Sequence, residues 1–292
     1  MSEQISCPFC GSPALPYLSS KDRNRHLSPD EYAYFRCESC DLVFLQPIPD
    51  NLPPHYEGGY QPIPGSLEEL RKMAAPERYR LEPIVEKAGG DLLEIGPWIG
   101  LFSINAKDAG FRVDAIEMSA EAAAFLRDVV GVSVVHTNDP AAALAAPKRY
   151  DVIVLWHSLE HLQEPWKVLE AAAKRLKQGG ILLVAIPNID GTQARFLGER
   201  WLHLDAPRHL YFWSPRGLAK LMQGFGLETL RLDTDDLLSQ VLERDAWWDY
   251  VRKIVRVPVL RGGAALCVAP ILHAATHRAG RGAGLTATFR AP

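Results

Sequence analysis

The chain has 292 residues, of which 47% are hydrophobic and 23% are charged, and its formal net charge is −3 at pH 7. These values are typical of a globular protein with room for one large domain and a small one, and they give no indication of a nucleic-acid partner. We expect no signal peptide, because the segment before Cys7 is polar, and no apolar run reaches the length of about 18 residues that a spanning helix needs. We therefore expect a cytoplasmic protein; the sequence does not indicate its oligomeric state.

Four of the five cysteines lie in the first 40 residues, as two C-x2-C pairs. Each pair is a tight turn that directs two thiolates to one point, and two such turns complete a tetrahedral shell suited to structural zinc. Four free thiols or two disulfides are the alternative, and disulfides are disfavoured in a cytoplasmic chain. We predict a zinc ribbon over residues 1–46, with a small β-hairpin between the pairs and with Cys7, Cys10, Cys37 and Cys40 as ligands.

Prolines and glycines crowd residues 47–66, which we interpret as a linker. Residues 67–292 are then predicted to form the second domain, which opens with a helix-compatible stretch over 67–87. Strands and helices alternate after it, with strands expected at 91–96, 111–118, 132–137, 150–156 and 181–187 and helices at 101–110, 120–129 and 164–180. This order predicts an α/β, doubly wound parallel sheet, which binds ligands at the carboxyl ends of its strands.

The turn after the first of these strands reads "EIGPWIG" over residues 94–100. Glu94 and Gly96 begin the turn, and Glu117 closes the second strand 23 residues after Glu94. An acidic residue about 20 positions after such a turn binds the ribose hydroxyls of a nucleotide-like cofactor. At this point a nicotinamide cofactor remains possible. Trp98 occupies the middle of the turn, where small residues usually let a ligand approach the backbone.

The turn, together with "VDAIEMS", "YDVIVLWHSLEHLQEP" and "LKQGGILLVAIPN", resembles the successive motifs of class I S-adenosylmethionine-dependent methyltransferases over residues 91–230. The sequence is most similar to bacterial members of sugar and polysaccharide pathways that carry an amino-terminal zinc ribbon and a segment like "WLHLDAPRHLYFW" (201–213). The resemblance implies a Rossmann-like sheet of seven strands whose last strand, expected at 285–291, is antiparallel. A helical insertion at about 237–284 would precede that strand.

The resemblance also implies S-adenosylmethionine as the cofactor and assigns residues to it by position. The turn around its methionine part would be formed by Glu94, Gly96, Pro97 and Gly100. Glu117 would hold the ribose hydroxyls and Met118 would pack on the adenine, whose amine Asn138 and Asp139 would reach. Leu155 and Trp156 would offer backbone carbonyls to the ammonium group. The family pattern has Gly where Trp98 stands, so the Trp98 ring either turns away from the cofactor or closes over it.

His157, Glu160 and His161 match the H-x-x-E-H pattern of some zinc peptidases. That pattern requires a long helix, whereas here His157 ends a strand and Pro165 opens the next helix. The same positions resemble a divalent-cation cluster of some quinone-pathway O-methyltransferases, with His157 in place of a carboxylate, and His is a poorer ligand for Mg²⁺. We prefer His157, and then His161, as the base that faces the acceptor, because His titrates near neutral pH. Glu160 can equally brace the adjoining loop.

Arg208, His209 and Tyr211 are expected on the loop before a helix that begins at Ser214 and Pro215. We predict that they line the acceptor site, since Arg binds carboxylates and phosphates in bidentate fashion. A structural Arg208 paired with Asp205 is the alternative.

The leading prediction is methyl transfer to a small polar acceptor: a sugar, a nucleotide-sugar or a glycan intermediate. The alternatives are a quinone or lipid O-methyltransferase, an rRNA methyltransferase, and a non-catalytic cofactor-binding or scaffold protein. Residues 251–292 contain seven Lys or Arg and no acidic residue, which indicates either a helical cover with solvated arginines or peripheral contact with a membrane.

Overall fold

The computed structural model describes residues 5–56, 62–255, 258–277 and 280–292, and contacts divide the chain into two compact units. The first unit comprises Met1–Glu57, Ile186–Ala219 and Leu232–Thr286, and the second comprises Gly58–Ala185, Lys220–Arg231 and Ala287–Pro292. This division does not follow the boundaries expected after residues 46 and 66, which stay predictions. Residues 57–61 of the expected linker lie outside the described residues; before them, η1 (Pro53–Tyr56) is a 3-10 turn.

Five parallel strands form the centre of the larger sheet: β4 (Asp91–Ile95), β5 (Arg112–Glu117), β6 (Ser133–His136), β7 (Tyr150–Trp156) and β8 (Leu176–Pro187). With β10 (Glu228–Asp233) and β11 (Gly284–Arg290), the sheet has seven strands in the order β10-β11-β8-β7-β4-β5-β6. β7 is apolar and almost wholly buried, as expected for a central parallel strand. The carboxyl ends of β4, β5 and β7 therefore lie along one edge, where the sequence places the candidate residues.

The last strand runs against the others. The Ala291 amide donates to the Gly180 carbonyl at 2.9 Å, and the Gly179 amide donates to the Ala291 carbonyl at 3.1 Å. The end of β11 thus meets the beginning of β8, which confirms the predicted antiparallel strand. The same pairing corrects the predicted helix at 164–180: it ends at Arg175, and β8 already begins at Leu176, because Gly179 and Gly180 pair with the chain end.

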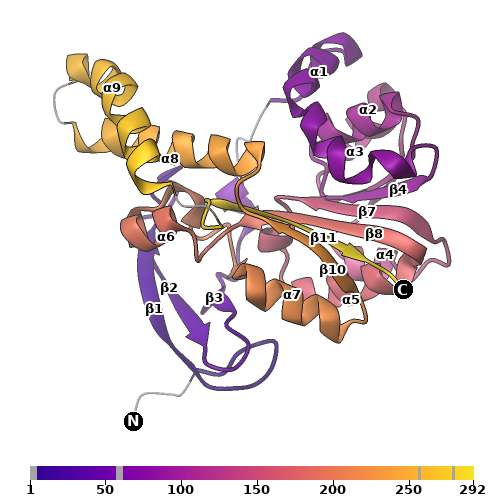
Figure 1. Cartoon of the computed structure of the whole chain (residues 1–292), viewed down its shortest axis with the longest axis horizontal. Helices are drawn as coiled ribbons and strands as arrows, with labels where there is room; N and C mark the ends of the chain where they lie inside the picture. The colour runs from indigo at the N-terminus through magenta and orange to yellow at the C-terminus, as the bar shows by residue number, and fades with distance from the viewer. Residues whose placement is uncertain (1–4, 57–61, 256–257, 278–279) are drawn as a thin grey trace. The chain divides into compact units, whose positions relative to one another are not determined.

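Helices cover both faces of the parallel strands. In Figure 1, α1 (Leu67–Ala74), α2 (Leu101–Asp108) and α3 (Ala120–Phe125) lie on one face, and α4 (Pro140–Ala143) and α5 (Pro165–Arg175) lie on the other. The predicted helix at 67–87 is only partly correct. It leaves the α-helical form after Ala74 and continues as the 3-10 segment η2 (Ala75–Lys87). Its two prolines, Pro76 and Pro83, explain the change because each removes an amide donor. After α3, a π-helical turn η3 (Leu126–Val130) follows.

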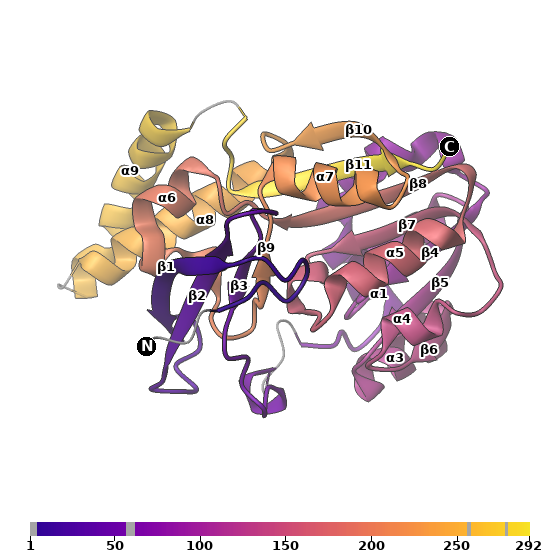
Figure 2. The same ribbon diagram turned by 90° about the horizontal axis from the view of Figure 1, so that it is seen from below.

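The first unit contains a smaller antiparallel sheet. β1 (Ala14–Lys21) and β2 (Glu31–Cys37) form the hairpin predicted between the cysteine pairs, and β3 (Val43–Leu45) follows. The fourth strand is β9 (Tyr211–Phe212), which pairs with β3 in the order β1-β2-β3-β9 (Figure 2). The expected loop over Arg208 to Trp213 is therefore wrong at Tyr211 and Phe212. A strand of two residues is too short to produce a recognisable alternation in the sequence.

Two long helices follow β10: α8 (Leu237–Ile254) and α9 (Pro258–Thr276), with α9 packed on α8 (Figure 1). The remaining helical segments are α6 (Thr192–Leu197), η5 (Gly198–Arg200), η6 (Leu202–Leu204) and α7 (Pro215–Gly224). Over the described part of the chain, none of the helices combines the length and apolar character needed to cross a membrane.

Candidate functional site

The turn after β4 holds three residues in the left-handed region, with φ of +73° at Gly96, +51° at Trp98 and +80° at Gly100. Only glycine adopts this conformation without steric cost. A Cβ at Gly96 would also lie 2.6 Å from Cβ of Ser158, and one at Gly100 would lie 2.6 Å from Leu126. The two glycines are thus required by the turn and its packing, and Trp98 carries backbone strain at the position where the family pattern has Gly.

The carboxylate of Glu117 ties this turn to the end of β5. Its Oε2 accepts the Trp98 amide at 2.9 Å, and its Oε1 accepts the Ser119 amide at 2.8 Å. Glu117 is buried, and burial raises the pKa of its carboxyl group. Each carboxylate oxygen has two lone pairs, so Glu117 can still accept bonds from ribose hydroxyls. The adjacent Met118 is 63% exposed and offers an apolar surface to a flat ring.

Glu94 is enclosed rather than open to the turn. Its Oε2 accepts the Ser103 hydroxyl of α2 at 2.5 Å, and the residue is buried. Burial raises the pKa of Glu94 to about 7, against the opposing effects of the Ser103 hydrogen bond and the positive charge of Arg80. Glu94 therefore braces α2 against β4, and Pro97, which is also buried, completes the turn.

Arg80 lies near Glu94 and Trp156, although it was not identified as a site residue from the sequence. Its guanidinium lies 5.1 Å from the ring centroid of Trp156, and it pairs with Glu77 at 2.7 Å. The Nε atom of Arg80 is buried and has no hydrogen-bond partner among the described residues. The 3-10 segment that carries Arg80 has no helical periodicity, so no pattern in the sequence marks it. A cation with a buried, unpartnered Nε atom suits the carboxylate of an amino-acid-like ligand.

The end of β7 supplies two further buried polar atoms. His157 follows the strand with φ of +50°, and its Nδ1 lies 3.3 Å from Oε1 of Glu160, which is fully buried. Within the part of the chain that the structure describes, Nε1 of Trp156 and Nε2 of His157 have no hydrogen-bond partner. Buried polar atoms without partners are uncommon and are often completed by a ligand. His161 lies on η4 (Leu159–His161), a single 3-10 turn, so the H-x-x-E-H residues do not form the long helix of a peptidase.

Other predicted cofactor residues occupy less informative positions. Asn138 is exposed, and Asp139 caps α4 by accepting the Ala142 amide at 2.9 Å. The side chain of Leu155 is fully buried within β7, so only its backbone is available to a ligand. The contacts of these three residues with the cofactor stay predictions.

The residues expected to line the acceptor site are buried and bind to other parts of the protein. Arg208 is fully buried, and its Nη2 lies 2.5 Å from Oδ1 of Asp205 and 3.1 Å from Oδ1 of Asp22. This is the pairing with Asp205 that we considered as the alternative. Nδ1 of His209 lies 2.8 Å from the His203 carbonyl, and Tyr211 is buried in β9. This geometry gives no support to substrate contacts by Arg208, His209 or Tyr211, which remain predictions.

The four amino-terminal cysteines converge. Sγ of Cys40 lies 3.6 Å from Sγ of both Cys7 and Cys10, and Sγ of Cys10 lies 3.4 Å from that of Cys37. In a tetrahedral shell with zinc–sulfur bonds of about 2.3 Å, neighbouring sulfur atoms are roughly 3.8 Å apart. The amides of Ser39 and Cys40 also point to Sγ of Cys37, both at 3.4 Å. The spacing fits one tetrahedral ion.

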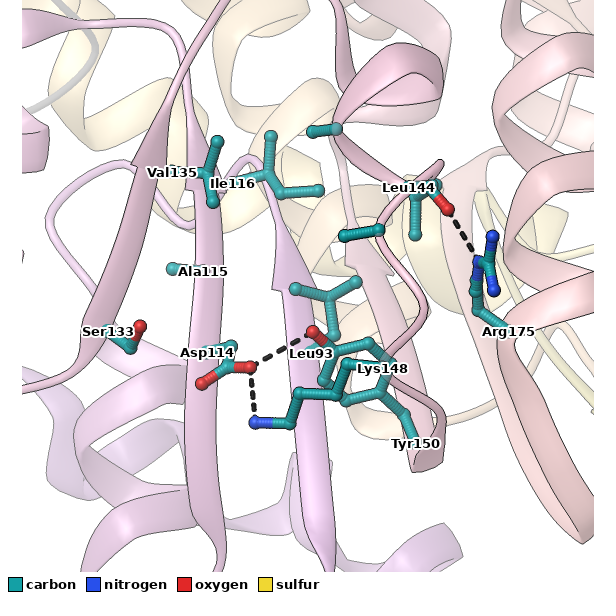
Figure 3. Close-up of a pocket in the computed structure, with 12 residues that line it drawn as sticks. Leu93, Asp114, Ala115, Ile116, Ser133, Val135, Leu144, Lys148, Tyr150 and Arg175 are labelled. Carbon is teal, nitrogen blue, oxygen red and sulfur yellow. Dashed lines mark hydrogen bonds and ion pairs between the residues drawn. The ribbon is translucent and has the colours of Figure 1, made fainter.

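A cavity of about 70 Å³ lies beside the parallel strands, between them and residues of α4 and α5 (Figure 3). Its lining is mainly apolar, with a polar group where Asp114 binds Lys148 at 2.6 Å and the Tyr150 hydroxyl at 3.0 Å. Its lining includes none of the candidate residues in the turns after β4, β5 and β7. Since sites for nucleotide-sized ligands are of the order of 300 Å³ or more, we assign no cofactor to it.

Comparison with known proteins gives consistent matches. A family model described as a methyltransferase domain matches residues 67–232. A ubiquinone biosynthesis O-methyltransferase from Cupriavidus pinatubonensis is 29% identical over 192 residues, covering 61% of this chain and 77% of that protein. One of the same name from Cereibacter sphaeroides is 28% identical over 190 residues, covering 60% and 76%. The structure of a SAM-dependent methyltransferase from Archaeoglobus fulgidus matches with a TM-score of 0.51 and 14% identity over 74% of this chain and 94% of that one, which shows a shared fold.

Proposed function

We propose that this chain, which belongs to the methyltransferase domain family and is a class I S-adenosylmethionine-dependent methyltransferase, methylates a ring hydroxyl of a quinone-pathway compound. The relatives that support this acceptor are named ubiquinone biosynthesis O-methyltransferase. They favour the quinone alternative over the sugar, nucleotide-sugar or glycan acceptor that we put first from the sequence. The rRNA and non-catalytic alternatives gain no support from them.

The buried polar atoms at the strand ends fit the cofactor. Glu117 would accept the ribose hydroxyls, and Met118 would cover the adenine. Arg80, with its unsatisfied Nε, would bind the carboxylate of the methionine part. When bound, S-adenosylmethionine supplies a methyl group to a nucleophile held in line with its sulfonium, so the protein acts mainly by positioning.

The observation that carries the proposal is the His157–Glu160 pair at the end of β7. With Nδ1 turned to Glu160, Nε2 of His157 is the atom left to take the proton of an acceptor hydroxyl. The buried carboxylate of Glu160 then holds the ring orientation and stabilises the imidazolium that forms. An aromatic hydroxyl has a pKa of about 10, as in Tyr, and gives its proton to His far more readily than an aliphatic sugar hydroxyl does.

The acceptor is tested by methyl transfer from the full chain to a catechol with an apolar tail and, in parallel, to a nucleotide sugar. We expect transfer to the catechol oxygen only. His157→Gln should lower kcat by about 10²- to 10⁴-fold, the range for loss of a general base, and leave the cofactor Kd unchanged. His26→Asn, in the loop between β1 and β2, is the matched control and should retain full activity. Transfer to the nucleotide sugar, or an undiminished kcat in H157Q, would overturn the proposal.

We also propose that Cys7, Cys10, Cys37 and Cys40 hold a structural zinc ion, on the strength of their sulfur spacing. A closed shell of four thiolates leaves no open position for a substrate, so the ion would stabilise the ribbon and take no part in the reaction. Cys10→Ser should lower the zinc content by one ion per chain and lower the melting temperature. An unchanged zinc content in C10S would refute this assignment.

Peripheral membrane contact through the carboxy-terminal region is a further part of the proposal. Leu266 and Ile271 on α9 are 65% and 66% exposed, and residues 251–292 carry no acidic side chain. Exposed apolar residues beside basic ones are typical of proteins that bind anionic lipid surfaces. Arg256 and Arg278, which contribute to this charge, lie outside the described residues. The wild type should sediment with anionic vesicles, whereas the Leu266→Glu variant should stay in the supernatant. Equal sedimentation of both would argue against the contact.

A further inference from the structure

A second group of metal-ligand side chains lies between α8 and α9, and nothing in the methyl transfer described above uses it. Glu243 of α8 is 3% exposed, and its Oε2 lies 3.1 Å from Nδ1 of His273 and 3.0 Å from Nδ1 of His277. His273 lies in the last turn of α9 and His277 directly follows the helix, where its amide donates to the His273 carbonyl at 2.8 Å. This further turn keeps the two residues close together, as at positions i and i+4 of a helix. Their rings lie with centroids 5.5 Å apart. Three ligand atoms, one from α8 and two from the carboxyl end of α9, thus converge on one small volume.

The arrangement is unusual for a purely hydrogen-bonded cluster. Both imidazoles direct the same nitrogen to the same carboxylate oxygen, and the contact of His273 Nδ1 does not have hydrogen-bond geometry. A buried carboxylate needs a compensating charge, because an isolated ion is costly to bury. Neutral histidines supply hydrogen bonds but no charge. A cation placed among the three atoms supplies that charge and uses the lone pairs of both rings.

The distances agree with a single ion. Zinc bonds of about 2.0–2.2 Å to nitrogen and oxygen separate neighbouring ligand atoms by roughly 3.3 Å in tetrahedral geometry. The observed separations of 3.0 and 3.1 Å are within a few tenths of an ångström of that value. Oδ1 of Asp235, itself buried and without a hydrogen-bond partner among the described residues, lies 4.0 Å from Nε2 of His277. A carboxylate facing the second ring nitrogen is the usual means of orienting a metal-bound histidine.

We propose that Glu243, His273 and His277 form a second divalent-metal site, with Zn²⁺ as the ion, which joins α8 to the last turns of α9. Two histidines and a glutamate are a ligand set that zinc uses in proteins, and the helix-like turn from His273 to His277 gives the four-residue spacing that zinc-binding histidines often have. The histidine side chains are 28% and 33% exposed, so the ion can enter from solvent. The ion would stabilise the helical hairpin that precedes β11.

The test is the zinc content of the full chain after removal of metal with a chelator, reloading with Zn²⁺ and washing. Glu243→Gln preserves the shape of the side chain and removes its charge, and H273A removes one ligand. We expect each variant to retain one zinc ion fewer than the wild type, while His203→Gln, whose ring bonds to the Leu242 carbonyl, retains the wild-type number.

The effect of Glu243→Gln on zinc content can be separated from the cysteine site by combining it with Cys10→Ser in one double variant. The double variant should lose a further ion. Circular dichroism checks that each variant folds. If H273A does not fold, the zinc content of E243Q alone decides the test. Equal zinc content in the wild type, E243Q and H273A would overturn the proposal and leave the cluster as a contact between Glu243 and the two histidines alone. Neither outcome depends on methyl transfer or on the identity of its acceptor.

Discussion

The backbone amide of Trp98 donates a hydrogen bond of 2.9 Å to the carboxylate of Glu117. This bond joins the turn after β4 to the end of β5, the two segments that would hold the cofactor. Any non-proline residue at position 98 can donate it, since it comes from the main chain. The large side chain at this position therefore leaves the link between the two segments intact, although its φ of +51° strains the backbone.

The first prediction concerns that strain. Left-handed φ costs a non-glycine residue about 1–2 kcal/mol, so Trp98→Gly should be more stable than Trp98→Ala by about 1 kcal/mol. At an ordinary loop position the order is the reverse, because glycine gains more entropy on unfolding. Urea unfolding of both variants measures the difference. Greater stability of W98A would show that residue 98 is not held in the left-handed region.

Glu117 should matter for cofactor affinity as well as for the turn, because Gln has one accepting oxygen in place of the two that bind the Trp98 and Ser119 amides. Glu117→Gln keeps the size of the side chain but weakens its bonds to ribose hydroxyls, and charge-assisted bonds are worth about 1.5–3 kcal/mol. We expect the Kd for S-adenosylmethionine, measured by calorimetry, to rise about ten- to hundredfold. Glu121→Gln, an exposed position in the first turn of α3, should leave the Kd unchanged. Equal affinities of E117Q and wild type would remove Glu117 from the cofactor site.

Glu94 should make stability depend on pH. Its pKa is raised from 4.5 to about 7 in the folded protein, so the folded state holds a proton that the unfolded chain releases. The resulting stabilisation is complete below pH 4.5 and is lost as the pH rises to about 7, by at most ~3 kcal/mol. Glu94→Gln cannot ionise and should lack this component of the pH dependence. Parallel profiles of unfolding free energy for wild type and E94Q between pH 5 and 8 would contradict the assignment.

Arg208 should be a structural residue. Arg208→Met leaves Asp22 and Asp205 buried without their cation, which typically costs about 3–5 kcal/mol. Arg23→Met removes a solvent-exposed pair with Glu199 and should cost no more than about 1 kcal/mol. Chemical unfolding compares the two variants. If R208M were as stable as R23M but had a raised KM for the acceptor, the substrate role predicted from the sequence would be restored.

Much of the fold could be predicted because the parallel strands are apolar runs with clear limits. β7 matches its predicted span of 150–156, and Glu117 closes β5 as expected. The boundaries that failed depend on tertiary partners: β8 starts early because the chain end pairs with Gly179 and Gly180, and β9 exists because β3 lies beside it.

Candidate site residues that directly follow a predicted strand could be proposed from the sequence, whereas those on irregular segments could not. His157 and Glu160 could be proposed from the sequence because they follow β7 directly. Arg80 was missed because a 3-10 segment brings it to Trp156 without any periodic pattern. The full burial of Arg208 could not be predicted, because a charged residue usually lies at the surface. Of the two aspartates that bind it, Asp205 is near in the sequence, but Asp22 is not.

The most direct measurement is the distribution of a labelled methyl group after the full chain acts on fractionated cell extract with labelled S-adenosylmethionine. Methylation of a quinone-pathway ring hydroxyl predicts label in the fraction extracted by organic solvent, bound through oxygen to an aromatic ring. That label should be absent when His157→Gln replaces the wild type. Label in RNA or in water-soluble sugars and glycans, with none in the aromatic fraction, would contradict it.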